Sequence, residues 1–246
     1  MNCIVDMKSV SNTKSADKPN EDLAVFEGDV GIGMVLDGVS RDKENGFYPT
    51  PSPAKEVTQL FSEIVLATAK KVGFPGLSRL QSSICAGNDA VEAYNKKLNH
   101  RFPAGTVGVV FSLEDGCLCY AYIGDCFAAL IRAGKMRVFT ESQTTMVREH
   151  RAELNSNEIR FDICNHAGHP YGYGVWDGNP GAMDFVKYGM ITLLKGDVIL
   201  IYTDGMAKII ENMTVEEVMN VPMDEMCDSD SIHNQDDRTC MRIKID

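Results

Sequence analysis

The sequence predicts an α+β fold in which strands come in runs and helices come in pairs. Two amphipathic stretches follow one another at 54–72 and 77–98, and four strand-like segments follow in quick succession between 105 and 139. This order differs from the strict alternation of strand and helix that a doubly wound parallel sheet requires. We therefore expect one layered domain over residues 1–246, without an internal linker.

The first third of the chain predicts a hairpin followed by the helix pair. Residues 1–22 are polar and mixed, and the apolar runs Leu23–Glu27 and 30–36 are separated by the turn residues Gly28 and Asp29. The second run ends abruptly in Asp37 and Gly38, and a loop is expected over 41–53. Apolar residues at spacings of three and four predict one buried face on each of the two helices.

The middle and last parts predict mostly strands. Strands are expected at 105–113, 117–123, 127–132 and 135–139, with turn residues between them that indicate a β-meander. A short helix is expected at 144–154, and 155–181 is a polar segment rich in Gly, Asn and His, so that 141–182 is predicted to form a flap. Strands are predicted at 183–193, 198–202 and 239–245, and short helices at 205–212 and 215–220, the latter capped by Thr214.

Composition excludes several classes of function. The net charge of −11 and the sequence pI of about 4.9 argue against a nucleic-acid ligand, because binding a phosphate backbone needs a basic face. No basic-then-apolar leader opens the chain and no apolar run approaches the ~20 residues that span a membrane, so we expect a cytoplasmic protein without membrane contact. The eight cysteines include no Cys-x-x-Cys pair and are expected to be thiols.

Acidic residues recur where predicted strands end or begin. Asp37, Asp125 and Asp204 each follow a strand, Glu21 and Asp22 precede the first one, and Asp236 precedes the last. Each acid taken alone fits a turn, where Asp and Gly are common. Taken together, acids gathered by adjacent strands would repel one another unless cations were bound, and a carboxylate set without His or Cys suits Mg²⁺ or Mn²⁺.

Six ordered motifs carry a resemblance to a known family. From residue 20 to the C-terminus, the sequence resembles the metal-dependent protein serine/threonine phosphatases, the PPM family or protein phosphatase 2C class. The motifs are NEDLAVF (20–26), MVLDGVS (34–40), GTVGVV (105–110), AYIGDCFAALIRAGKM (121–136), LIYTDGM (200–206) and DDRTCMRIKI (236–245).

The resemblance implies a fold, an activity and a set of site residues. The fold would be a central sandwich of two antiparallel β-sheets flanked by pairs of α-helices. The activity would be hydrolysis of phosphoserine and phosphothreonine in proteins by a water that two divalent cations, Mn²⁺ or Mg²⁺, activate. Asp37 would bridge the two cations and, with Asp204, form the catalytic core; the full ligand set would be Glu21, Asp22, Asp37, the Gly38 carbonyl, Asp125, Asp204 and Asp236, with Asp125 and Asp204 able to hold a third cation.

The sequence departs from the family pattern at two places. The Arg that many members have before the first motif, where it binds substrate phosphate, is absent, and Lys18 or Lys14 is the available substitute. After Asp37 and Gly38, Val39 and then 40–42 (Ser-Arg-Asp) replace the commoner continuation. Two alternatives therefore stay open beside the protein phosphatase: a pseudophosphatase that serves as a binding or regulatory module, and a phosphatase of small phosphorylated molecules.

Overall fold

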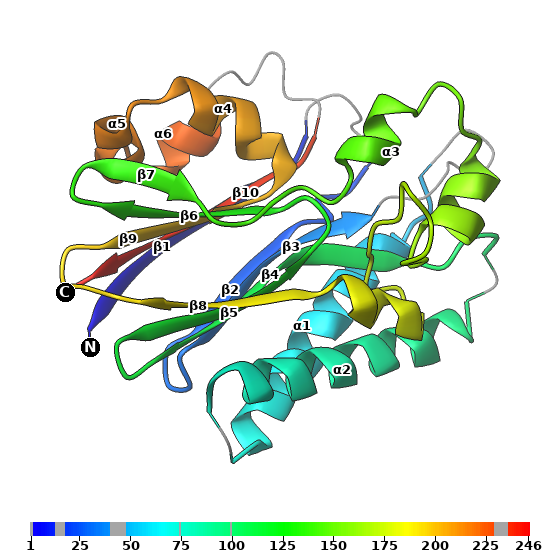
Figure 1. Cartoon of the computed structure of the whole chain (residues 1–246), viewed down its shortest axis with the longest axis horizontal. Helices are drawn as coiled ribbons and strands as arrows, with labels where there is room; N and C mark the ends of the chain where they lie inside the picture. Colours follow the sequence, from blue (N-terminus) through cyan, green and yellow to red (C-terminus); the bar gives the residue numbers. More distant parts are fainter. Residues whose placement is uncertain (1, 13–17, 40–47, 74, 99, 229–235) are drawn as a thin grey trace.

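Two five-stranded antiparallel sheets pack face to face with helices on both outer sides (Figure 1). The computed structural model describes residues 2–12, 18–39, 48–73, 75–98, 100–228 and 236–246. The four layers are helix, sheet, sheet and helix, which confirms the α+β sandwich predicted from the sequence. None of the helices in these described segments has the length and apolar character that crossing a membrane needs.

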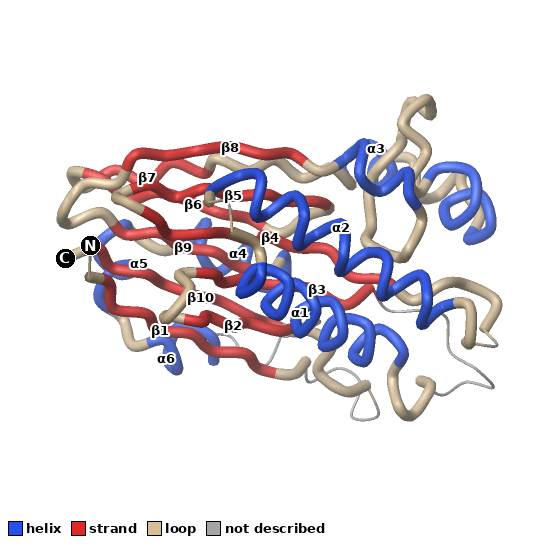
Figure 2. The backbone as a smooth tube through the Cα atoms, turned by 90° about the horizontal axis from the view of Figure 1, so that it is seen from below, coloured by secondary structure: helices blue, strands red, loops and turns tan. Residues whose placement is uncertain are grey.

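The first sheet joins strands from both ends of the chain. Its order is β1 (Cys3–Val10), β10 (Arg238–Ile245), β9 (Val198–Tyr202), β6 (Phe127–Arg132) and β7 (Lys135–Val138). The second sheet has the order β2 (Leu23–Glu27), β3 (Ile32–Val39), β4 (Gly105–Glu114), β5 (Cys117–Ile123) and β8 (Lys187–Thr192). Both termini lie at one end of the sandwich and α3 (Thr145–Glu149) at the other, as Figures 1 and 2 show.

Two long helices cover the second sheet. Helix α1 (Pro53–Lys71) begins after Ser52, whose hydroxyl accepts a hydrogen bond from the Lys55 N–H at 3.3 Å, and Pro53 suits the first turn. Its residues Val57 and Phe61 are fully buried. Helix α2 (Gly76–Asn95) packs beside α1, with Leu80, Ile84 and Val91 buried.

Three short helices cover the first sheet. They are α4 (Ala207–Asn212), α5 (Val215–Asn220) and α6 (Met223–Asp228). Thr214 caps α5 as predicted, in a reciprocal arrangement with Glu217. The side chains of Met206, Ile210, Val218 and Met226 pack on the outer face of β9 and β10 in a second apolar cluster.

Several local predictions were wrong in ways that matter for the site. The strand predicted to end before Asp37 continues to Val39, so Asp37 lies inside β3 opposite Val107 of β4. The polar stretch 1–22 contains β1, which forms a sheet edge, and the acidic stretch after Pro222 contains α6. Lys14 and residues 40–47, which include part of the loop predicted at 41–53, lie outside the described residues.

The predicted β-meander is also wrong, because the chain changes sheet after its second strand. Strands β4 and β5 pair in the second sheet, whereas β6 and β7 pair in the first. The crossing occurs at 124–126, where Gly124 has a φ of +80° and a Cβ would lie 2.5 Å from the Val107 side chain. Glycine permits this turn, and the crossing places Asp125 between the two sheets.

Candidate metal centre

Strand register brings the predicted acids to one end of the sandwich. Leu23 lies opposite Leu36, so Asp22 is beside Asp37. Gly108 lies opposite both Leu36 and Ile123, which brings the turn after β5 close to Asp37. In the first sheet, Tyr202 pairs with Phe127 and with Cys240, so the segments that hold Asp204, Asp125 and Asp236 also converge.

Three of these carboxylates form a compact group. One oxygen from each of Asp37, Asp125 and Asp204 lies within 4.8 Å of the other two. The three residues come from β3, from the crossing between the sheets and from the turn after β9. Oxygen donors at this spacing, without a His or Cys among them, suit a hard divalent cation such as Mg²⁺ or Mn²⁺.

Burial and mutual repulsion disfavour the charged form of the acids. Burial, followed by the charges of Asp22 and Asp204, raises the pKa of Asp37 well above its usual value. Burial and then Asp237 raise the pKa of Asp22 to about 8, and burial and Asp125 raise the pKa of Asp204. A bound cation would relieve this repulsion, so the electrostatics of the group agree with the chemistry of its donors.

Two threonine hydroxyls hold the backbone and side chains of the group in place. The Thr106 hydroxyl donates to the Asp37 carbonyl oxygen at 2.9 Å, and Thr106 is fully buried. The Thr203 hydroxyl donates to the Asp22 carboxylate at 2.9 Å. Thr106 therefore has a structural role beside Asp37.

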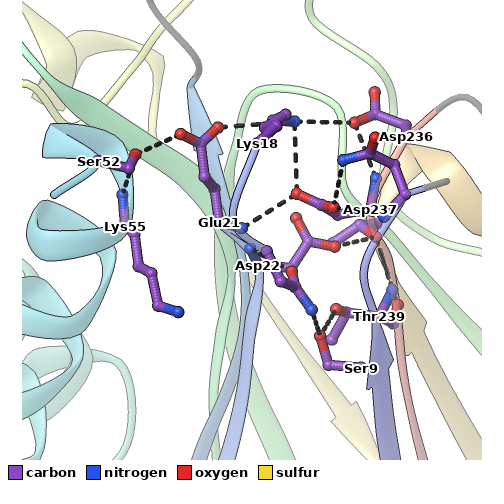
Figure 3. A network of polar contacts seen from close by, with 12 residues as sticks. Ser9, Lys18, Glu21, Asp22, Ser52, Lys55, Asp236, Asp237 and Thr239 are labelled. Carbon is purple, nitrogen blue, oxygen red and sulfur yellow. Dashed lines mark hydrogen bonds and ion pairs between the residues drawn. The ribbon is translucent and has the colours of Figure 1, made fainter. Parts of the chain in front are cut away.

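Lys18 lies among the carboxylates of Glu21, Asp236 and Asp237 (Figure 3). Its ammonium is 3.6 Å from the Glu21 carboxylate and 3.4 Å from those of Asp236 and Asp237. Burial opposes its charge, but Asp237 and Asp236 outweigh burial and raise its pKa. The three neighbouring carboxylates thus stabilise the charged form of this lysine.

Asp237 anchors the network around Lys18. Its carboxylate accepts hydrogen bonds from the backbone N–H of Asn12 at 2.9 Å and of Glu21 at 3.0 Å. The Glu21 carboxylate in turn accepts from the Ser52 hydroxyl at the start of α1. Asp237 thereby joins β10, the segment before β2 and the end of β1, and it fixes where Glu21 and Asp236 lie.

Arg148 of α3 contacts two members of the acid group. Its Nη2 atom is 2.6 Å from an oxygen of Asp125 and 2.6 Å from an oxygen of Asp204. The Thr144 hydroxyl donates to the same Asp125 oxygen at 2.9 Å. The side chain of Arg148 is 57% exposed, yet its guanidinium reaches the acids.

The acid group lines a pocket of about 670 Å³. Asp37, Asp125, Asp204 and Asp236 form part of its wall with the Gly38 backbone. Cationic side chains from the 141–182 segment and from the start of the chain line it as well: Lys18, Arg148, Arg151 and Arg160. The pocket thus combines a carboxylate group with nearby cationic side chains, an arrangement suited to a cation and an anion together.

The structure brings together most of the residues singled out in the sequence. Asp37, Asp125 and Asp204 form the close group, and Asp22 and Asp236 are near enough to raise the pKa of Asp37. Glu21 is buried beside Gly38, directed at Ser52 and Lys18. Sequence reasoning missed the contacts of Arg148 and the anchoring role of Asp237, because their partners are distant in the sequence. Asp125 is 23 positions from Arg148, and Asn12 is 225 positions from Asp237.

Comparison with known proteins supports the resemblance at the level of the fold. No family model matches the sequence. A protein of Oryza sativa subsp. japonica that carries the name of a protein phosphatase 2C is 23% identical over 202 residues, which cover 82% of this chain and 53% of that protein. The chain therefore spans about half the length of this curated relative.

Solved phosphatase structures superpose on the whole chain. The serine/threonine phosphatase PstP of Mycobacterium tuberculosis matches with a TM-score of 0.72 at 18% identity, over 99% of each chain. The catalytic domain of PstP in complex with two manganese ions matches with a TM-score of 0.71 at 18% identity, again over 99% of each chain. The PPM Ser-Thr phosphatase MsPP of Mycobacterium smegmatis, in complex with cacodylate, matches with a TM-score of 0.69 at 15% identity over 99% and 98%.

Proposed function

We propose that this protein hydrolyses phosphoserine and phosphothreonine in proteins and that it needs divalent cations to do so. The observation that carries the proposal is the group formed by Asp37, Asp125 and Asp204, with oxygens within 4.8 Å of one another, which lines a pocket in a phosphatase fold. The proposed ligands also include Asp22, Asp236, Glu21 and the Gly38 carbonyl. Cations held there would supply Lewis-acid activation of water and of the phosphate ester.

The residues of the chain contribute position and charge. The hydroxyl of Thr106 holds the Asp37 carbonyl, and Asp37 itself is fixed inside β3 rather than on a loop. Carboxylates that are fixed before a ligand arrives lose little freedom on binding it. Lys18 and Arg148 lie along the same pocket and offer positive charge toward the dianionic phosphate group of a substrate.

The solved neighbours support the choice of cation and of substrate class. PstP was solved with two manganese ions, and the neighbours PstP and MsPP are named as serine/threonine phosphatases. Their fold covers nearly all of this chain. We therefore propose two Mn²⁺ or Mg²⁺ ions as cofactors, a phosphorylated protein as substrate, one catalytic domain over residues 1–246 with a flap at 141–182, and the cytoplasm as the place of action.

The test is metal-dependent turnover by acid-to-amide variants. With Mn²⁺ present, the wild-type protein is expected to hydrolyse p-nitrophenyl phosphate and a phosphothreonine peptide, and EDTA is expected to abolish both activities. Asp37→Asn and Asp204→Asn should each lower kcat/KM by at least roughly a hundredfold, the scale seen when groups that stabilise transition-state charge are removed. Asp89→Asn, an exposed position on α2 outside the pocket, is the matched control and should keep wild-type activity.

The same assays separate the proposal from its alternatives. Turnover of p-nitrophenyl phosphate without turnover of any phosphoserine or phosphothreonine peptide would favour a phosphatase of small molecules. Binding of Mn²⁺ without turnover of either substrate would favour a pseudophosphatase. Activity that survives EDTA or the Asp37→Asn substitution would contradict the metal-dependent reaction itself.

A further inference from the structure

We propose that the Arg148 guanidinium forms ion pairs with Asp125 and Asp204 and competes with a divalent cation for these two carboxylates. The inference rests on the proposed function only in taking the acid group as a cation site. It concerns an arginine on the short helix α3, a side chain to which the sequence motifs assign no role.

The guanidinium lies where a cation bound by both Asp125 and Asp204 would lie. A single nitrogen of Arg148 is 2.6 Å from one oxygen of Asp125 and 2.6 Å from one oxygen of Asp204. Both carboxylates belong to the group whose oxygens lie within 4.8 Å of one another. A cation that used these same two oxygens would have to displace the guanidinium, because two positive charges cannot share them at such distances.

The segment that carries Arg148 has further contacts with the acid group and with the core. The Thr144 hydroxyl donates to the Asp125 oxygen that Arg148 contacts, so α3 is tied to the acid group at both of these residues. Val147, between them, is buried against the core. Displacement of the guanidinium would leave this segment attached by Thr144 and Val147 and would free Arg148 within the pocket.

The strength of the competition is expected to be modest. The side chain of Arg148 is 57% exposed, and those of Asp125 and Asp204 are 12% and 20% exposed. Partly exposed ion pairs are individually weak, so millimolar concentrations of a divalent cation can overcome them. Arg148 therefore raises the concentration of divalent cation that is needed to occupy the site at Asp125 and Asp204, but it does not prevent binding.

The test counts Mn²⁺ ions bound to the full chain by equilibrium dialysis, without any measurement of activity. Arg148→Gln is expected to bind one more Mn²⁺ per chain than the wild type at the same free concentration, or to bind its weakest ion about fivefold tighter, in line with the small free energies of partly exposed ion pairs. Arg148→Lys keeps the charge but loses the planar fork, so its affinity should lie between the two. Far-UV circular dichroism of each variant checks that it is folded.

The matched control is Arg151→Gln, which changes the net charge equally. Arg151 lines the same pocket but donates to the Leu154 carbonyl at 3.1 Å. The Arg151→Gln variant should bind Mn²⁺ as the wild type does. If Arg151→Gln gains as much affinity as Arg148→Gln, the effect is one of net charge and the inference is overturned.

The remaining outcomes separate this inference from the proposed function. If wild type and Arg148→Gln bind the same number of ions with the same affinity, the competition does not exist although the metal centre does. If neither protein binds Mn²⁺, both the metal centre and the competition are refuted. Hydrogen exchange gives a second readout: saturating Mn²⁺ should speed exchange of the amides at 144–151 in the wild type and leave their rates unchanged in Arg148→Gln.

Discussion

Gly38 shows how little room the structure leaves beside Asp37. A Cβ at this position would lie 2.8 Å from the Glu21 Cβ, 2.8 Å from the Glu21 carbonyl oxygen and 3.0 Å from the Thr58 hydroxyl. Two of these atoms belong to backbone or to its first side-chain carbon and cannot move freely. The requirement for glycine here is thus steric, and it comes from the segment that carries Glu21.

Gly38→Ala is therefore expected to lower the free energy of unfolding by about 1–3 kcal/mol, the usual cost of forcing a methyl group into a packed region. Urea unfolding monitored by circular dichroism measures it. The control is Gly73→Ala, where a Cβ would meet nothing within 4 Å. Equal stability of the two variants would show that the backbone near Glu21 adjusts at little cost.

Thr106 supports the candidate metal centre through a partly buried hydrogen bond to the Asp37 carbonyl. Thr106→Val keeps the shape but removes the donor, and the loss of one intramolecular hydrogen bond costs about 0.5–1.5 kcal/mol. We expect a loss of stability in that range together with weaker Mn²⁺ binding, both measurable by calorimetry. Thr106→Ser restores the hydroxyl and should recover Mn²⁺ affinity; if it does not, the methyl group rather than the hydrogen bond is what matters.

At the scale of elements, an ion pair ties the two sheets together near the turn between β8 and β9. Arg132 at the end of β6 donates to both oxygens of Asp197, at 2.9 and 2.6 Å, and to the Thr192 carbonyl of β8 at 2.7 Å. Asp197 also accepts from the Leu194 N–H at 2.7 Å. One arginine thus connects the edge of the second sheet to the first.

This pair gives a prediction about pH. The hydrogen bond from Arg132 is the main reason that the pKa of Asp197 is held below its usual value. The charged carboxylate therefore adds stability above the unfolded-state pKa of about 3.9, and this contribution is lost as the pH falls toward the lower folded-state pKa. Asp197→Asn should be less stable than wild type at pH 7, by about 1–2 kcal/mol.

The difference between Asp197→Asn and wild type should shrink as the pH is lowered from about 5 through the unfolded-state pKa of about 3.9, because the folded-state pKa lies below it. Urea unfolding at several pH values follows it. Asp89→Asn, an exposed change of the same kind, should show no such dependence. A stability difference that stays constant across this range would mean that the Asp197 hydrogen bonds, and not its charge, matter.

Local patterns predicted individual elements well and their pairing poorly. Strands β2, β5, β6 and β9 and helix α5 have the predicted bounds, because alternation, turn residues and the Thr214 cap act over a few neighbouring residues. The meander prediction failed because strand partners are chosen by the packing of the two sheets, which adjacent residues do not encode. Asp125 was recognised from its motif. Its place between the sheets could not be predicted, because it depends on the crossing from β5 to β6 that the meander prediction missed.

The candidate site divides in the same way. The six motifs predicted which acids would gather, and the register of β2, β3, β4 and β9 explains how they do so. The cations that balance them were harder to predict: Arg148 reaches Asp204 across 56 positions and Lys18 reaches Asp236 across 218. An arginine on a short polar helix has the same sequence signature whether it contacts solvent or a carboxylate.

At the scale of the whole molecule, residues near Trp176 join the 141–182 segment to the core. Trp176 is fully buried and stacks on Phe61 of α1 with ring centroids 4.5 Å apart. Its backbone forms two hydrogen bonds with Thr106 of β4, at 3.1 and 3.0 Å. From α2, the side chain of Asn95 donates to the Asp177 carbonyl at 2.7 Å, so this part of the segment contacts α1, α2 and β4 at once.

Trp176 is the single tryptophan of the chain and reports on this packing by its fluorescence. Because its ring lies in the same apolar core as the helices and sheets, the predicted flap should remain attached near Trp176 until the whole domain unfolds. Urea curves from tryptophan fluorescence and from far-UV circular dichroism should therefore coincide, as expected for a domain that unfolds in one step. A fluorescence transition at lower urea than the circular dichroism transition would show instead that the segment detaches first and that the chain contains two units of different stability.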